Sequence, residues 1–181
     1  MKVCIDPGHG GTDPGAIGRN PQRLEEKEFN LKVGLLLEQE LDALGHDVIM
    51  TRRIDRTLSL GARARFANQH GAQLLVSIHA NAAASDQAEG MEVFHFPGSQ
   101  SGREAARPVL QAMLTAFPGH RDRGVKEANF AVLRLTAMPA ILVECEFLTH
   151  PGQLRFLADP ANQAGLAKAM AGAIDSTAAQ G

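Results

Sequence analysis

Two histidines lie directly after apolar runs that predict buried strands. His9 follows the segment Lys2–Asp6 on a glycine-rich turn, and His79 closely follows the apolar residues Leu74–Val76. An imidazole at a strand end, next to small residues, has open space in front of it and a rigid sheet beneath it. This placement suits a metal ligand or a catalytic base. Two such histidines in one small chain predict a shared site.

A carboxylate interrupts the most apolar segment of the chain. Glu144 lies in the strand predicted over 140–147, where a charge is costly unless it is paired, protonated or functional. Glu146 should face the same side of that strand. Because two carboxylates on one buried face repel each other, we expect one of them at the exposed end of the strand. Acidic residues also begin the first long helix, at Glu25 and Glu26, where interaction with the helix dipole is the alternative role.

These residue types together are those of a catalytic zinc site. Two imidazoles and one carboxylate can hold zinc and leave a fourth position for water, whose pKa falls to about 7. A further carboxylate can take the proton of that water and later deliver it to a leaving amine. His9, His79, one glutamate from the helix start and Glu144 supply this set. The glycines beside His9 leave a phosphate-binding turn as an alternative, although no Gly-Lys-Ser/Thr motif follows; a binding module without catalysis is another.

The other histidines and both cysteines have simpler explanations. Structural or surface roles are expected for His46, His70, His95, His120 and His150. We expect Cys4 and Cys145 to be buried thiols in core strands. A disulfide between neighbouring strands is the alternative, whereas zinc ligation is disfavoured because neither cysteine lies in a CxxC pair.

The elements that must position these residues alternate between strands and helices, which predicts an α/β fold. Strands are expected over 2–6, 46–51, 73–79, 91–96, 130–135 and 140–147. Apolar residues at helical spacing predict a helix over 26–44, and N-cap residues predict helices over 60–69 and 160–176. Pro108 is expected inside or at the start of a helix that ends near Phe117, and N1 is the placement that proline favours at a helix start. The last residues are expected to fray.

Length and composition indicate one ordinary globular domain over 1–181. Hydrophobic residues make up 44% and charged residues 21%, and the net charge of −2 gives no basic signature for nucleic acid or an anionic membrane. No apolar run is long enough to span a bilayer, and no signal peptide is recognised at the start. Carbohydrate-binding modules usually stack sugars on Trp or Tyr rings, and the chain has neither; it also has no linker and no repeat. We therefore expect no wall-binding module.

The motifs in combination resemble the zinc-dependent N-acetylmuramoyl-L-alanine amidases of the type 3 family. In chain order they are Asp-Pro-Gly-His-Gly-Gly at 6–11, Glu-Lys at 26–27, Leu-Ser-x-x-x-Arg-Ala-x-x-Ala-Asn at 58–68, Ser-Ile-His-Ala-Asn at 77–81, Gly-Val-Lys-x-Ala-Asn-Phe-x-Val-Leu-Arg at 124–134 and Met-Pro-Ala-x-Leu-Val-Glu at 138–144. Order and spacing both match, and the resemblance extends over nearly the whole chain, from residue 2 to about residue 173.

The resemblance implies a site, a reaction and a fold. It places one Zn²⁺ on His9, Glu26 and His79 and the catalytic carboxylate on Glu144; Glu25 competes with Glu26, which is favoured by Lys27 next to it and by the helix register. The implied activity is hydrolysis of the amide between N-acetylmuramic acid and L-alanine in peptidoglycan by a monomeric enzyme. A zinc peptidase or deacetylase acting on another cell-wall amide is the alternative. The implied fold is a mostly parallel six-stranded sheet flanked by helices.

The chain also departs from the family pattern. Glu146 replaces a glycine before Phe147 and is interpreted as a substitution at the rim, with tuning of Glu144 or binding of a substrate amine as alternatives. His150 replaces an asparagine. Arg63 and Asn129 match family positions, where structural roles are at least as well supported as substrate contacts.

Two further expectations concern access and location. Gly8, Gly10 and Gly11 should give clearance to a metal and a bulky glycopeptide. Only residues 82–89 separate the Ser-Ile-His-Ala-Asn motif from the next strand. These are too few for the blocking helix of the family's regulated members, so an open site is expected, as in lysins and sporulation-type amidases.

The protein is expected to act on the cell wall after cytoplasmic synthesis and release by lysis, or as a trimmed mature domain.

Overall fold

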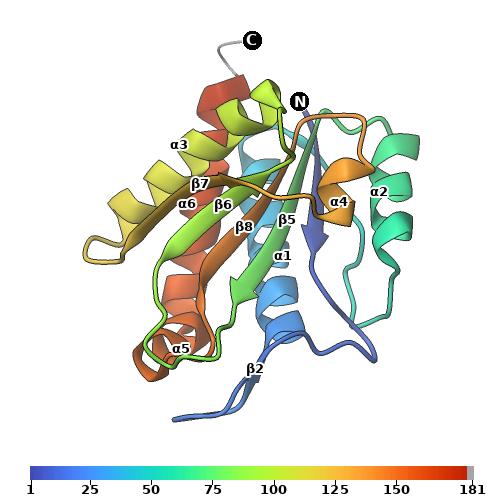
Figure 1. Cartoon of the computed structure of the whole chain (residues 1–181). Helices are drawn as coiled ribbons and strands as arrows, with labels where there is room; N and C mark the ends of the chain where they lie inside the picture. The colour runs from blue at the N-terminus through green and yellow to red at the C-terminus, as the bar shows by residue number, and fades with distance from the viewer. Residues whose placement is uncertain (179–181) are drawn as a thin grey trace.

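A twisted six-stranded sheet in the order β4-β1-β5-β8-β6-β7 runs through the computed structural model, which describes residues 1–178 (Figure 1). The strands are β1 (Lys2–Pro7), β4 (Asp47–Met50), β5 (Leu74–Asn81), β6 (Met91–His95), β7 (Asp122–Glu127) and β8 (Ala140–Phe147). β4, β1, β5 and β8 are mutually parallel, β6 pairs antiparallel with β8, and β7 pairs parallel with β6. The mostly parallel sheet predicted from the sequence is confirmed.

Helices cover the two faces of this sheet unequally. The helices are α1 (Glu26–Ala43), α2 (Leu60–Gln69), α3 (Gln100–Ala116), α4 (Ala131–Arg134), α5 (Pro151–Ala158) and α6 (Pro160–Ala178). α1, α3 and α6 pack on one face over the larger hydrophobic cluster, and α2 and α4 pack together on the other face over a smaller cluster. Part of the second face, over β6, β7 and β8, carries no helix (Figure 1).

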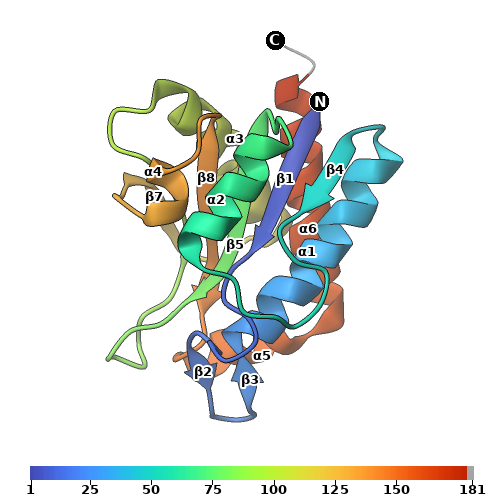
Figure 2. The same cartoon turned by 90° about the vertical axis from the view of Figure 1, so that its right-hand side faces the viewer.

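The carboxyl ends of β1 and β5 point toward the same end of the molecule. Figure 2 shows the small hairpin of β2 (Ile17–Gly18) and β3 (Leu24–Glu25) at that end, below the two strands. Ligand sites of open parallel sheets form at the carboxyl ends of the strands. The two strands that were expected to place the histidines therefore end at the same side of the sheet.

Local signals in the sequence account for the first two long helices. α1 buries Phe29, Val33 and Leu37 along one stripe and begins with a capping box, in which Glu25 and Glu28 satisfy each other's backbone amides. α2 begins with Ser59 as N-cap, whose hydroxyl accepts from the amide of Ala62 at 3.2 Å. Both predicted helices are confirmed to within a residue at each end.

One predicted element is wrong in type, and for another the structure decides between two placements that the sequence left open. The segment 130–135 is not a strand; it holds the short helix α4, because Val132 and Leu133 are buried in the cluster shared with α2 and this packing overrides their β propensity. The helix near Pro108 begins at Gln100, after Ser99 as N-cap, so Pro108 lies inside α3 rather than in its first turn.

Other features were missed or lie beyond the described residues. The sequence did not predict β7, α5 or the β2–β3 hairpin. Cys4 lies in the smaller cluster and Cys145 in the larger one, and both are buried free thiols, so the disulfide alternative is wrong. Among the described helices, none is long and apolar enough to cross a bilayer. The expected fraying of the last residues concerns 179–181, outside the described residues.

Candidate metal centre and active site

His9 leaves β1 in a backbone conformation that few residues adopt. Its φ of 60° is the one positive value of a non-glycine residue within residues 1–178. Such a conformation costs free energy and persists only when the surroundings hold it in place. In this conformation the His9 ring lies 5.1 Å, centroid to centroid, from the ring of His79 near the end of β5.

Two buried arginines hold this turn by its carbonyl groups. Arg63 of α2 donates to the carbonyls of Pro7 at 2.7 Å and His9 at 2.5 Å. Arg52, after β4, donates to the carbonyls of Pro7 and Gly8, both at 2.9 Å. Arg63 also pairs with the buried carboxylate of Asp6 at 2.9 Å. The contacts of Arg63 therefore support the structural role that was considered for it, which is to hold the turn after β1.

Glu26 brings the two histidines together. One carboxylate oxygen lies 3.2 Å from Nε2 of His9, and the other lies 2.8 Å from Nδ1 of His79. A ligand atom of each of the three residues lies within 4.8 Å of those of the other two. Glu25 instead contacts Arg23 and Lys27 at the surface. The geometry thus selects Glu26 over Glu25 as the partner of the histidines.

Contacts within the cluster shift the pKa values of Glu26 and His9. Burial alone would raise the pKa of Glu26, but hydrogen bonds from His79 and His9 hold that pKa far below its usual range. Burial would lower the pKa of His9, yet its hydrogen bonds with Glu26 and Asp13 raise it. Nδ1 of His9 donates to Asp13 at 2.8 Å, which orients the ring and leaves Nε2 facing Glu26.

Glycines make room for this close packing at two positions. A Cβ atom on Gly8 would lie 2.2 Å from the His79 ring, and one on Gly15 would lie 2.5 Å from the Glu26 carboxylate. The clearance expected at Gly8 is therefore real, but it makes room for the side chain of His79. Gly10 and Gly11 instead face the backbone of the segment after β4, at 2.4–2.5 Å, so their expected role toward metal and glycopeptide is wrong.

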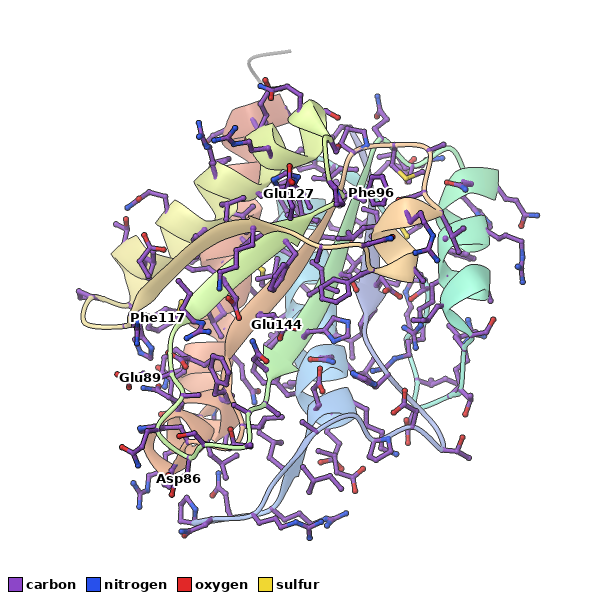
Figure 3. The ribbon with its side chains drawn as sticks, viewed as in Figure 1. Asp86, Glu89, Phe96, Phe117, Glu127 and Glu144 are labelled. Atoms are coloured by element: carbon purple, nitrogen blue, oxygen red, sulfur yellow. The ribbon has the colours of Figure 1, made fainter. Side chains whose placement is uncertain are left out.

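Glu144 lies on the same sheet face as this cluster, in register with His79 of the neighbouring strand. Figure 3 shows it on the open face of the sheet, below α4. One of its carboxylate oxygens is buried without a hydrogen-bond partner. Burial, and then repulsion from Glu26 and Glu92, raises the pKa of Glu144 well above its usual range. An orphaned buried carboxylate with a raised pKa is typical of a general acid or base.

A cavity of about 510 Å³ connects these groups. Its wall includes His9, Asp13, His79 and Glu144, together with apolar side chains from the segments that begin α2 and α4. This volume lies in the usual range of small-molecule sites. The candidate residues taken from β1, β5 and β8 therefore open into one space.

Glu146 departs from its expected place at the rim. It is fully buried, and it accepts hydrogen bonds from His120 and from the amides of Gly90 and Phe147 at 2.8–3.1 Å. Between His79 and Asn81 the register against β8 shifts by one residue, so the simple alternation behind the prediction does not hold. Glu146 ties the loop before β6 to β8 and stays away from Glu144.

The remaining histidines have the structural roles expected of them. His46 lies 3.2 Å from Asp175, His70 contacts the carbonyl of Phe66, and His95 is buried. His150 is the N-cap of α5 and accepts from the amides of residues 152 and 153. Asn129 accepts from Arg134 at 2.6 Å, which fixes the turn before α4.

Sequence reasoning gave no role to several residues around the cluster. Asn30 is buried one turn after Glu26 and donates to it at 3.4 Å. The feature of the sequence that could have revealed it is a polar residue on the apolar stripe of α1. Glu92 is buried in β6 directly opposite Glu144. A charged residue inside a short apolar strand is the feature of the sequence that could have revealed it. Asp13 lies two residues after the Asp-Pro-Gly-His-Gly-Gly motif, and no contact was predicted for it.

The turn after β1 does not suit a phosphate. The amide of Gly8 donates to Ile78, that of Gly10 to Asp13 and that of Gly11 to Asp55, at 2.6–3.0 Å. Phosphate-binding turns present free amides to the ligand. Because these amides are already used within the protein, the phosphate-binding alternative is wrong.

Known proteins are similar to this chain in sequence. Residues 3–176 match the family model described as N-acetylmuramoyl-L-alanine amidase, Amidase_3. The N-acetylmuramoyl-L-alanine amidase LytC of Bacillus subtilis is 40% identical over 151 residues, 82% of this chain and 29% of that protein. CwlM of Bacillus licheniformis, with the same activity in its name, is 38% identical over 83% of this chain and 58% of that protein. The chain thus spans about half or less of the length of these relatives.

Solved structures agree with the sequence matches. An N-acetylmuramoyl-L-alanine amidase from Clostridium difficile 630 superposes with a TM-score of 0.94 at 35% identity, covering 98% of this chain and 96% of that one. The catalytic domain of CwlV from Bacillus (Paenibacillus) polymyxa gives a TM-score of 0.91 at 33% identity, covering 98% of each chain. By family model, sequence and fold, this chain belongs to the Amidase_3 family of N-acetylmuramoyl-L-alanine amidases.

Proposed function

We propose that this protein hydrolyses peptidoglycan at the amide that joins the lactyl group of N-acetylmuramic acid to L-alanine of the stem peptide. The observation that carries the proposal is the convergence of His9, Glu26 and His79 within 4.8 Å of one another, on a cavity that Glu144 also lines. Family membership directs this chemistry to the muramoyl amide rather than to another amide of the wall. We also expect a monomer, to be checked by its mass in solution.

The residues of the cluster fit a catalytic zinc ion. Two imidazole nitrogens and one carboxylate match the donor set of such sites, and Asp13 supplies the carboxylate that commonly orients a ligating histidine. Zinc, when bound to His9, Glu26 and His79, supplies a Lewis acid that polarises the amide carbonyl and makes hydroxide available at neutral pH. We propose one zinc per chain at this position.

Glu144 performs the proton transfers in this proposal. Its raised pKa brings a carboxyl group closer to the working pH, where it can both accept and return a proton. It takes a proton from the attacking water and then gives one to the nitrogen of L-alanine, so that the amine leaves uncharged. The rigid sheet register next to His79 holds it in place during both steps.

Two variants separate the roles of ligand and base. We expect His79→Ala to lose both zinc and turnover, because it removes one of three donors. We expect Glu144→Gln to keep zinc near one per chain while turnover falls by roughly 10²–10⁴. Metal content per chain and release of stem peptide from purified peptidoglycan measure the two effects. Undiminished hydrolysis by the Glu144→Gln variant would contradict the proposed role.

A further inference from the structure

Two exposed apolar side chains line the cavity that holds His79 and Glu144. Phe130 is 39% exposed and Leu60 is 57% exposed, and both belong to the wall of that cavity. Phe130 is the one exposed phenylalanine of the eight, all of which lie in the described part of the chain. Large apolar side chains left in water at the wall of a site indicate a contact with a ligand.

Both side chains are held by ordered structure. Phe130 is the N-cap residue of α4, and its ring meets that of Phe94 edge to face at a centroid distance of 5.3 Å. Leu60 is the first residue of α2, directly after the capping Ser59. α2 and α4 pack against each other. A surface built on packed helices loses little entropy when it binds.

The sheet beyond Glu144 has a different character. Glu92, in register with Glu144 on the next strand, contacts both Lys126 and Arg123 of β7. Two cations against one carboxylate leave a surplus positive charge there. These three side chains are not part of the cavity wall. Glu144 therefore has the apolar side chains in its own cavity and a positively charged strip on the neighbouring strands β6 and β7.

The substrate of the proposed reaction is divided in the same way. Its N-acetylmuramoyl half is uncharged and presents methyl groups and ring C–H groups, whereas the stem peptide carries carboxylates. Because charge complementarity sets the orientation of a ligand, we propose that Phe130 and Leu60 form the subsite for the N-acetylmuramoyl half. The stem peptide then extends past Glu144 toward Lys126. This inference rests on the proposed function.

The test asks whether the Phe130 side chain contacts the sugar of the substrate. It does so by removing the side chain from the enzyme and, separately, the sugar from the substrate. The substrates are N-acetylmuramoyl tripeptide and D-lactoyl tripeptide, which share the amide and the peptide and differ in the sugar. On the muramoyl substrate we expect Phe130→Ala to raise KM roughly tenfold with little change in kcat, because a contact kept from ground state to transition state affects binding alone. On the lactoyl substrate, we expect Phe130→Ala and the parent protein to agree within about twofold. Leu60→Ala should follow the same pattern with a smaller change.

Matched controls come from the same elements. Leu135, 47% exposed at the other end of α4, and Ile54, 65% exposed in the segment before α2, do not line the cavity. Leu135→Ala and Ile54→Ala should retain the parent's preference for the sugar. Phe130→Leu keeps the apolar volume and serves if the alanine variant melts early; it should lose part of the preference.

Two results would overturn the subsite. One is an equal loss on both substrates, which would place Phe130 on the peptide side or in the scaffold. The other is an unchanged KM of Phe130→Ala and Leu60→Ala on the muramoyl substrate. A parent protein that cleaves neither amide would instead contradict the proposed function, so the two failures are distinguishable.

Discussion

Glu144 has a buried oxygen that lacks a hydrogen-bond partner, a stability cost that the proposed role in proton transfer would explain. Its neighbours Glu26 and Glu92 are both acidic, and together with burial they raise the pKa of Glu144. The sequence identified this residue because a carboxylate interrupts an apolar strand. The same strand misled the prediction for Glu146, since a one-residue register shift between neighbouring strands leaves no local mark in the sequence.

The cost at Glu144 gives a pH dependence of known sign. Because the folded-state pKa is raised, the unfolded chain ionises first as the pH rises, and folded stability is lost on passing the folded pKa. In chelator, we expect Glu144→Gln to match the parent near pH 4 and to exceed its free energy of unfolding by about 1–3 kcal/mol at pH 8. Urea unfolding at the two pH values measures the difference. A gain at pH 4 as large as that at pH 8 would argue against ionisation as the cause.

Gly8 tests the packing behind His79. In Gly8→Ala the new Cβ would lie 2.2 Å from the imidazole, so the ring must leave its place beside Glu26. We expect zinc affinity to fall at least about tenfold, as for loss of an orienting contact around a metal ligand. Gly172→Ala is the control, because its Cβ has no neighbour within 4 Å in α6, and it should stabilise the helix by about 0.5–1 kcal/mol. Equal zinc affinity in Gly8→Ala and the parent protein would contradict this view of the glycine.

At the scale of elements, the first turn of α5 depends on one histidine. His150 accepts from the amides of Gly152 and Gln153 at 3.1 and 3.2 Å, at a position where the family pattern implied an asparagine. We expect His150→Ala to cost about 0.5–2 kcal/mol of stability and His150→Asn to cost little, because asparagine is a good N-cap. Thermal melting above pH 7 compares the two variants. Equal melting temperatures for both would exclude a capping role.

Another link between elements is the ion pair of Asp6 and Arg63. It joins the end of β1 to α2, and Asp6 also accepts from Thr51 and Ser77 at 2.6 and 2.8 Å. Removal of one partner leaves a buried charge without compensation. We expect Arg63→Met to cost roughly 3–5 kcal/mol and to weaken zinc binding through release of the His9 turn. Urea unfolding and zinc titration measure both effects; stability equal to the parent's would contradict the assigned role.

At the scale of the whole molecule, pattern and periodicity predicted the sheet and its main helices but not every connection. α1 and β8 carry strong, regular apolar patterns and were predicted to within a residue of their ends. α4 could not be predicted, because its four residues are helical only through packing against α2. β7 carries the sequence Asp-Arg-Gly-Val-Lys-Glu, whose charges hide a strand that lies at the sheet edge.

The candidate site followed from a simple rule of topology. His9 follows β1 and His79 lies near the end of the neighbouring parallel strand β5, so their side chains meet at the carboxyl end of the two strands. Glu26 was less certain from sequence, because Glu25 beside it has the same chemistry and only the start of α1 decides between them. The contacts of Asn30 and Asp13 needed coordinates, since neither pattern nor spacing indicates them.

The central claim is tested most directly by the products of purified peptidoglycan. The digest is run with the protein as prepared, after chelator, and after zinc is returned, and the soluble products are identified by mass spectrometry. We expect free stem peptides with a new L-alanine amino terminus and unpeptidylated glycan, loss of both with chelator, and their return with zinc. Products cut within the peptide or the glycan, or a digest that chelator leaves unchanged, would contradict a zinc-dependent N-acetylmuramoyl-L-alanine amidase.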